Sequence, residues 1–308
     1  MLPFVFLDES KMFNIKAWGL MCAIGYFAWD HVATKRITRL HYNPATFNSF
    51  AAWTFANVAF WGHALDSIFY HPDVLRARPW SIFLIWENMS SMGGIIGSII
   101  GAVIWKFVQV NKEGLKIWPS LRQTPLPILP YTDVMCATYP MAMAFGRLGC
   151  AVVHDHPGAL APSGTWAAVR WPLSAQDGTH HVWGPLHVQV GGSLTRYDLG
   201  LIECIFVALL AAIVALTWNR KLRVGTYTIV ICLGYTPARF VMDFYRATED
   251  FEGDKRWGTL TFAQYATIAM FAYGLFLWWK MKRDPGYGSD VSKLRPALVQ
   301  TNDNAPET

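Results

Sequence analysis

Apolar residues in this chain are gathered in blocks whose length is close to that needed to cross a lipid bilayer. A transmembrane helix requires about 20 predominantly apolar residues, each adding about 1.5 Å of rise. Seven blocks of this kind occur, with approximate bounds 13–33, 47–70, 88–109, 131–153, 199–218, 225–245 and 262–281. The pattern predicts an all-α fold, that of a polytopic membrane protein with about seven transmembrane helices.

The composition agrees with this class. Hydrophobic residues make up 53% of the 308 residues and charged residues only 15%, whereas a soluble domain carries about 25% charged residues. The five cysteines fall in or at the ends of the predicted spans, without Cys-x-x-Cys spacing. They therefore support neither a disulfide framework nor a zinc knuckle.

The distribution of lysine and arginine predicts the orientation, because cytoplasmic loops are enriched in both. The connections after the first, third and fifth blocks carry most of them, including Lys35, Lys112 and Arg220. We therefore expect the N-terminus outside the cytoplasm and the C-terminus inside it. The net charge of +5 then reflects membrane topology and not nucleic-acid binding.

One transmembrane domain is expected over residues 1–285. Its connection 154–198 is rich in Gly, Pro, His and Trp, which predicts short strands and turns on the outer surface. Residues 286–308 predict a disordered cytoplasmic tail. No internal repeat of the kind found in transporters is evident, which disfavours a transporter.

The stretch SMGGIIGSIIG places Gly93, Gly94, Gly97 and Gly101 at helical spacing. Small residues at this spacing are typical of close helix packing in membranes, which is the interpretation we favour. The alternative is that they leave room for a lipid headgroup or acyl chain.

Three arginines lie within or at the ends of apolar blocks, where an unpaired guanidinium is costly. Arg147 ends the fourth block, and Arg239 and Arg246 lie seven residues apart on one face of the sixth, with Asp243 between them. A structural ion-pair cluster with Glu203 is one interpretation. An anion site is the other, because the planar fork of arginine suits phosphate.

Several sequence motifs follow one another along nearly the whole chain. The first block begins with IKAWGLMCAIGYFA, and MSSMGGIIG (89–97) and DVMCATYPMAMAFGRLGC (133–150) lie in the third and fourth. RYDLGLIE (196–203) and RFVMDFYR (239–246) follow. In this order they resemble the motifs of the prolipoprotein diacylglyceryl transferase family. The corresponding family motifs are Met-Ser-x-His-Gly-Gly-x-x-Gly, a segment ending in Gly-Arg-x-Gly-Asn, Arg-His-Pro-Ser-Gln-x-Tyr-Glu and Arg-x-x-x-Glu-x-x-Arg.

This resemblance implies a bacterial inner-membrane enzyme that moves diacylglyceryl from phosphatidylglycerol to the lipobox cysteine thiol of prolipoproteins, releasing glycerol phosphate. The expected partners are phosphatidylglycerol and prolipoprotein signal peptides, and the expected state is a monomer. The resemblance implies no metal or organic cofactor. The alternative function is that of a non-catalytic or substrate-shifted membrane homologue that binds anionic phospholipid.

The chain departs from the family's pattern at several positions. Met92 replaces the motif histidine and cannot transfer a proton. Cys150 stands in place of the asparagine after Gly-Arg-x-Gly, and Asp243 in place of a glutamate. His154 and Asp155 take the place of a Gly-Glu pair. Either a nearby histidine has taken over the proton-transfer role, or the chain has changed substrate or lost activity.

The resemblance and the chemistry together suggest roles for single residues. We expect Arg147 to bind phosphate, Arg239 to stabilise the leaving group and His154 to act as the base, oriented by Asp155. His154 is expected to face Arg147 and Arg239, whereas His156 is expected to shape the turn before Pro157. The other predicted substrate-binding residues are Gly149, Glu203, Asp243 and Arg246.

The histidines allow further interpretations. A metal site would take ligands from His154, Asp155 and His156, to which His180, His181 and His187 could add further ligands. Neighbouring residues seldom bind one ion as a set, and we therefore predict no metal. The remaining alternative is that the loop histidines only cap a helix end or hold a turn.

Overall fold

The computed structural model describes the chain at residues 2, 4–7, 16–85, 87–154, 156–162, 164–166, 168–171, 179–183, 186–190, 194–247 and 256–287. It divides into two compact units. The first consists of Met1–Ala33, Cys136–Lys221 and Val230–Asp254, and the second of Thr34–Met135, Leu222–Ile229 and Lys255–Thr308. Most of the tail expected at 286–308 lies outside the described residues, as does Asp155.

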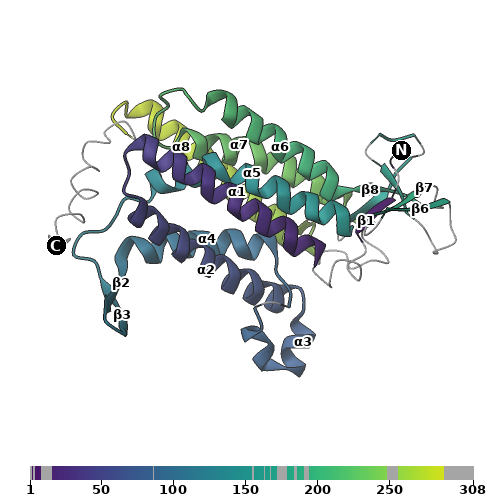
Figure 1. The fold of residues 1–308 in the computed structure, drawn as a ribbon, viewed down its shortest axis with the longest axis horizontal. Coiled ribbons are helices and arrows are strands. Elements are labelled where there is room, and N and C mark those ends of the chain that lie inside the picture. Colours follow the sequence, from purple (N-terminus) through teal and green to yellow (C-terminus); the bar gives the residue numbers. More distant parts are fainter. Residues whose placement is uncertain are drawn as a thin grey trace. The chain divides into compact units, whose positions relative to one another are not determined.

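Long helices account for most of the described chain (Figure 1). They are α1 (Ala17–Leu40), α2 (Pro44–Phe69), α4 (Ser91–Phe107), α5 (Leu129–Val153), α6 (Leu199–Thr217), α7 (Thr226–Met242) and α8 (Phe262–Arg283). Each predicted block overlaps one of them. Among the described helices, α5 and α6 are long and apolar enough to cross a membrane, and α4 contains a shorter apolar run, Met92–Phe107. The number of spans stays a prediction.

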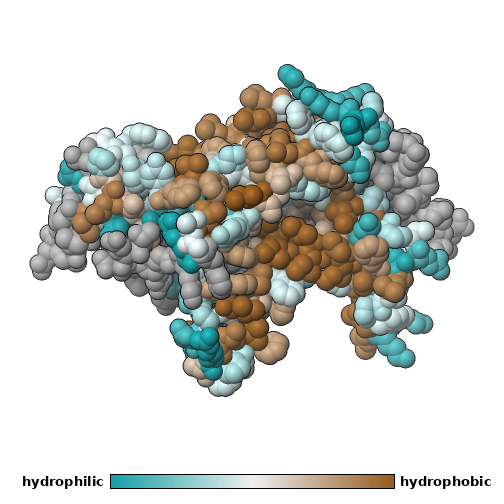
Figure 2. Space-filling view, turned by 180° about the vertical axis from the view of Figure 1, so that it is seen from behind, coloured by the Kyte–Doolittle hydropathy of each residue, from teal (hydrophilic) through white to brown (hydrophobic). Residues whose placement is uncertain are grey.

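Many large apolar side chains on these helices are exposed. Phe27 on α1 is 69% exposed, and Leu216 on α6 is 83% exposed. Figure 2 shows hydrophobic residues over much of the visible face. An apolar surface of this kind is expected where helices contact lipid and not water.

Polar side chains set the starts of several helices by accepting hydrogen bonds from free backbone N–H groups. The Asn43 side chain accepts from Ala45 N at 2.8 Å before α2, and Ser90 Oγ accepts from Gly93 N at 2.9 Å in α4. Thr261 forms a reciprocal capping box with Gln264 at the start of α8. These caps explain why the helices begin within a few residues of the predicted blocks.

In the second unit, α2 and α4 pack closely through glycines (Figure 1). A Cβ on Gly93 would lie 2.6 Å from the carbonyl oxygen of Trp61, and one on Gly101 would lie 2.6 Å from that of Trp53. A Cβ on Gly97 would collide with the carbonyl oxygen of Asn57. The favoured interpretation of this stripe, close helix packing, is therefore confirmed for these three glycines.

Two short helical segments follow α2, namely α3 (Pro72–Ala77) and the 3-10 segment η2 (Pro79–Phe83). Trp80 and Phe83 in η2 are 61% and 71% exposed. A hairpin of β2 (Val108–Glu113) and β3 (Lys116–Leu121) follows α4 and was not expected from the sequence. A two-stranded pair, β9 (Arg256–Trp257) and β10 (Leu260–Thr261), precedes α8.

The connection between α5 and α6 forms short strands in the first unit. They are β4 (Pro157–Leu160), β5 (Ala168–Trp171), β6 (Thr179–Trp183), β7 (Leu186–Val190) and β8 (Leu194–Asp198). One antiparallel sheet has the order β4-β8-β5. The other has the order β1-β7-β6 (Figure 1), in which β1 (Phe4–Leu7) pairs Val5 with Val188.

The glycine contacts between α2 and α4 predict the effect of added methyl groups. Gly97→Ala should destabilise the protein by about 1–3 kcal/mol, because the methyl group meets backbone that cannot move aside. Gly94→Ala is the matched control, since a Cβ there would meet only the Val58 side chain at 3.4 Å. Thermal unfolding of the two variants in detergent measures the difference. Equal melting temperatures would contradict the packing interpretation.

Candidate functional site

The candidate site is built around the carboxylate of Glu203, on the second turn of α6. This side chain is 3% exposed and contacts groups from both neighbouring helices. Arg147 Nε on α5 lies 3.1 Å from Oε2, and Arg239 Nε on α7 lies 3.9 Å from Oε1. The Tyr235 hydroxyl donates to Oε1 at 2.5 Å. The two arginines therefore meet at one carboxylate.

A second carboxylate extends the cluster along the end of α7. Arg239 Nη1 donates to Asp243 Oδ1, and Arg246 Nε lies 3.6 Å from the same oxygen. The spacing in the sequence placed these three residues on one face, and the observed contacts agree. The α-helix ends at Met242, and Asp243–Tyr245 form the 3-10 turn η3, so the helix is shorter than the block expected to 245.

The five charged side chains of this cluster are Arg147, Glu203, Arg239, Asp243 and Arg246. Three guanidinium groups against two carboxylates leave one positive charge in excess within this set. Arg147 Nε contacts Glu203, and its Nη1 lies near the sulfur of Cys150 and Nε2 of His156. Buried guanidinium groups with spare donors can bind an anion such as a phosphate group.

Close backbone contact sets the distance between the helices that carry the cluster. A Cβ on Gly200, at the start of α6, would lie 2.9 Å from Ala151 N on α5. Cys204 Sγ donates to Ala144 O at 3.3 Å one turn further on. A Cβ on Gly149 would lie 3.1 Å from Met21 Cβ on α1, so this glycine packs against α1. Its expected part in substrate binding stays a prediction.

The structure contradicts the expected orientation of His154. Its Nδ1 lies 2.9 Å from Asp198 Oδ2, and its Nε2 lies 2.8 Å from the Val5 carbonyl oxygen. Both partners are acceptors, so both ring nitrogens act as donors and neither offers a lone pair to a thiol. The ring also stacks edge-on against Trp171 at 5.1 Å. The interpretation of His154 as a base facing Arg147 is therefore wrong for this conformation.

His156 is the histidine that contacts the arginine cluster. Its Nε2 lies 3.4 Å from Arg147 Nη1, which also lies 3.8 Å from the sulfur of Cys150. His156 was expected mainly to shape the turn before Pro157, and its side chain also contacts Arg147.

Two residues of the site were not selected from the sequence. Asp198 caps α6, where Oδ1 accepts from Leu201 N at 2.9 Å, and binds His154 through Oδ2. Its place just before an apolar block is an N-cap pattern that could have identified it. Tyr235 has no such pattern, because an aromatic residue within a span is ordinarily a packing residue.

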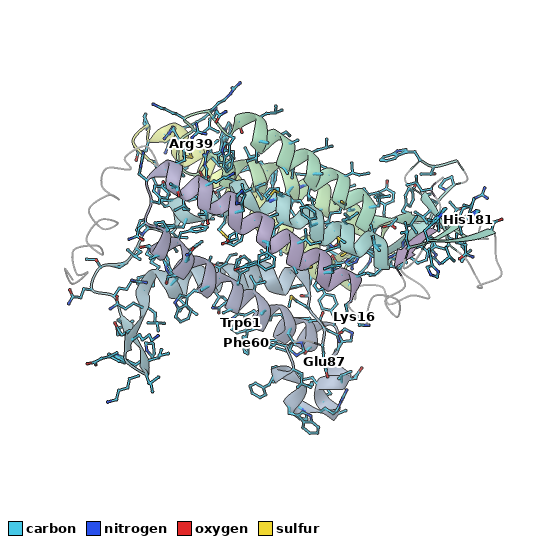
Figure 3. All side chains as sticks on the ribbon, viewed as in Figure 1. Lys16, Arg39, Phe60, Trp61, Glu87 and His181 are labelled. Atoms are coloured by element: carbon cyan, nitrogen blue, oxygen red, sulfur yellow. The ribbon has the colours of Figure 1, made fainter. Side chains whose placement is uncertain are left out.

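The described residues contain no group of three His, Cys, Asp or Glu that could hold a metal ion. His181 lies on β6 (Figure 3). There it stacks with Trp183 at 5.8 Å. His187 on β7, which pairs with Val182 of β6, is buried.

Comparisons with known proteins extend over most of the chain. The family model described as "Prolipoprotein diacylglyceryl transferase" matches residues 5–280. A "Phosphatidylglycerol--prolipoprotein diacylglyceryl transferase" of Chromohalobacter salexigens is 26% identical over 276 residues, covering 89% of this chain and 90% of the relative. A protein of the same description from Idiomarina loihiensis is 27% identical over 263 residues, covering 85% of each chain.

The shared carboxylate predicts a graded response to substitution. Glu203→Gln should destabilise the protein by about 3–5 kcal/mol, because two buried guanidinium groups lose a counter-charge. Tyr235→Phe should cost about 1.5–3 kcal/mol, since it removes one hydrogen bond to that carboxylate. Thermal unfolding in detergent measures which of the two variants has the lower melting temperature. A Tyr235→Phe variant that melts below Glu203→Gln would contradict the central place given to Glu203.

Proposed function

Because the chain belongs to the prolipoprotein diacylglyceryl transferase family, we propose that it moves diacylglyceryl from phosphatidylglycerol to the lipobox cysteine thiol of prolipoproteins. The single observation that carries this proposal is the family match over residues 5–280. The cluster of Arg147, Arg239 and Arg246 supports it, since the reaction involves an anionic headgroup. The alternative, a homologue that only binds lipid, is less favoured because the relatives compared are described as transferases.

The chemistry explains why arginines suit this reaction. The thiol loses its proton, the sulfur attacks a glyceryl carbon, and the carbon–oxygen bond to phosphate breaks. The phosphodiester, which carries one negative charge, becomes a glycerol phosphate monoester with about two. Negative charge therefore grows on the phosphate during the reaction. Donors fixed around that group stabilise the transition state more than the ground state.

Each arginine has a distinct part in this proposal. Arg147 binds the phosphate through nitrogen atoms that Glu203 does not occupy. Arg239 stabilises the leaving group from the opposite side of Glu203. Asp243 holds Arg239 in place and is also bound by Arg246. The Arg246 side chain is 18% exposed against 5% for that of Arg239, so it lies at the edge of the cluster.

The remaining expectations are part of the same proposal. Seven helices cross the bacterial inner membrane as one transmembrane domain, with the N-terminus outside and the C-terminus in the cytoplasm. The strands between α5 and α6 then lie on the outer side, where exported prolipoproteins arrive. The chain works as a monomer with phosphatidylglycerol and prolipoprotein signal peptides as its partners.

An exchange of arginine for lysine tests the leaving-group role. Arg239→Lys keeps the charge but loses the planar fork, and the rate of transfer to a lipobox peptide should fall by about a hundredfold. Mass spectrometry of the peptide after incubation with phosphatidylglycerol measures the rate. Arg76→Ala is the control, because that side chain is 80% exposed and should have no effect. Full activity of Arg239→Lys would exclude the proposed role.

Reporter fusions test the orientation. A fusion at Thr165, in the strand region, should report the outer compartment, and one at Asn111, in the β2–β3 hairpin, should report the cytoplasm. The physical reason is that lysine and arginine, which are enriched in cytoplasmic loops, are in excess near Asn111. The same compartment for both positions would overturn the arrangement.

A further inference from the structure

The backbone holds His156 between the ends of three elements of the first unit. Its carbonyl oxygen accepts from Leu199 N at the start of α6, at 3.3 Å. The next carbonyl, of Pro157, accepts from Ala247 N after η3, at 3.4 Å, and Gly158 forms a β-bridge with Arg246. The backbone of His156 is therefore held by the same segments that carry Glu203 and Asp243.

The contact with Arg147 identifies the tautomer of His156. A guanidinium nitrogen can only donate, so Nε2 of His156 must be the acceptor and carry no proton. The lone pair of Nε2 is then directed at the nitrogen that would bind phosphate. At 3.4 Å the contact is long for a hydrogen bond and is easily exchanged for another partner.

Several other titratable groups near the cluster are already engaged. Both ring nitrogens of His154 donate to acceptors, and Tyr235 donates its proton to Glu203. Glu203 and Asp243 are already bound to guanidinium groups. Met92, at the position of the family's histidine, has no group that accepts a proton near neutral pH.

We propose that His156 is the general base of the transfer reaction, an inference that rests on the function proposed above. When phosphate binds, Arg147 Nη1 donates to a phosphate oxygen and releases the lone pair of Nε2. The lipobox thiol then gives its proton to Nε2, the sulfur forms a bond to the glyceryl carbon, and the electrons of the broken carbon–oxygen bond remain on glycerol phosphate. The proton passes from His156 to that phosphate monoester, whose second pKa is about 6.

A selenocysteine acceptor separates proton transfer from every other step. The cysteine thiol has a pKa of about 8.5 and is mostly protonated at pH 7, whereas a selenol is mostly ionised there and needs no base. In His156→Gln the amide oxygen can still accept from Arg147, so the contact is kept and only the basic nitrogen is lost. The experiment compares transfer from phosphatidylglycerol to cysteine and selenocysteine lipobox peptides by the full chain in nanodiscs.

We expect His156→Gln to slow transfer to the cysteine peptide by about a hundredfold and transfer to the selenocysteine peptide far less. The rate with the selenocysteine peptide divided by the rate with the cysteine peptide should therefore rise by about a hundredfold. His154→Gln is the matched control. It loosens the same turn without removing the base, so it should slow both acceptors equally. If His156→Gln does not fold, the same comparison is made with His156→Asn.

Two results would overturn the inference. An unchanged ratio in the folded His156 variant would mean that the residue has only a structural part, although the unmodified protein transfers. No transfer by the unmodified protein to either peptide would overturn the proposed function, and the role of His156 with it.

Discussion

The arrangement of the first unit depends on one buried carboxylate shared by two guanidinium groups. Arg147, Glu203 and Arg239 come from α5, α6 and α7, one from each helix. Removing such charges from water costs several kcal/mol per ion, and the cost is recovered only when every partner is in place. The pairing therefore permits a single register of the three helices. The contact of Gly200 with the backbone of α5 allows the approach that this register requires.

The same pairing determines which parts of the arginines face a ligand. Glu203 binds Arg147 through Nε, so the far end of the guanidinium, with Nη1, is directed at His156 and Cys150. Arg239 is held by Glu203 on one side and by Asp243 on the other. A carboxylate that already neutralises part of the charge makes it possible to keep these arginines buried before any ligand binds. It also leaves the excess charge for the anion.

The features predicted correctly from the sequence are those that depend on residues close together in the chain. Apolar blocks located the long helices, and the spacing of Arg239, Asp243 and Arg246 placed them on one face. Helical spacing also identified the glycines that pack α4 against α2. The β2–β3 hairpin was missed because β2 follows directly from the apolar helix α4, and no turn pattern separates the strand from the helix. The partners of Glu203 depend on how three helices meet, and no local pattern specifies that.

The exchange of roles between His154 and His156 depends on one turn. His154 has a φ of 52°, in the left-handed region that residues other than glycine seldom occupy. Such a conformation persists only where its surroundings hold it, and here Asp198 and the Val5 carbonyl bind both ring nitrogens. Asp198 lies 44 positions away and Val5 149, so the sequence around the turn contains no sign of either. Because Asp198 also caps α6, the turn that directs His154 away from Arg147 is joined to the helix that carries Glu203. The position of His156 beside Arg147 is therefore a consequence of the same contacts that removed His154 from the site.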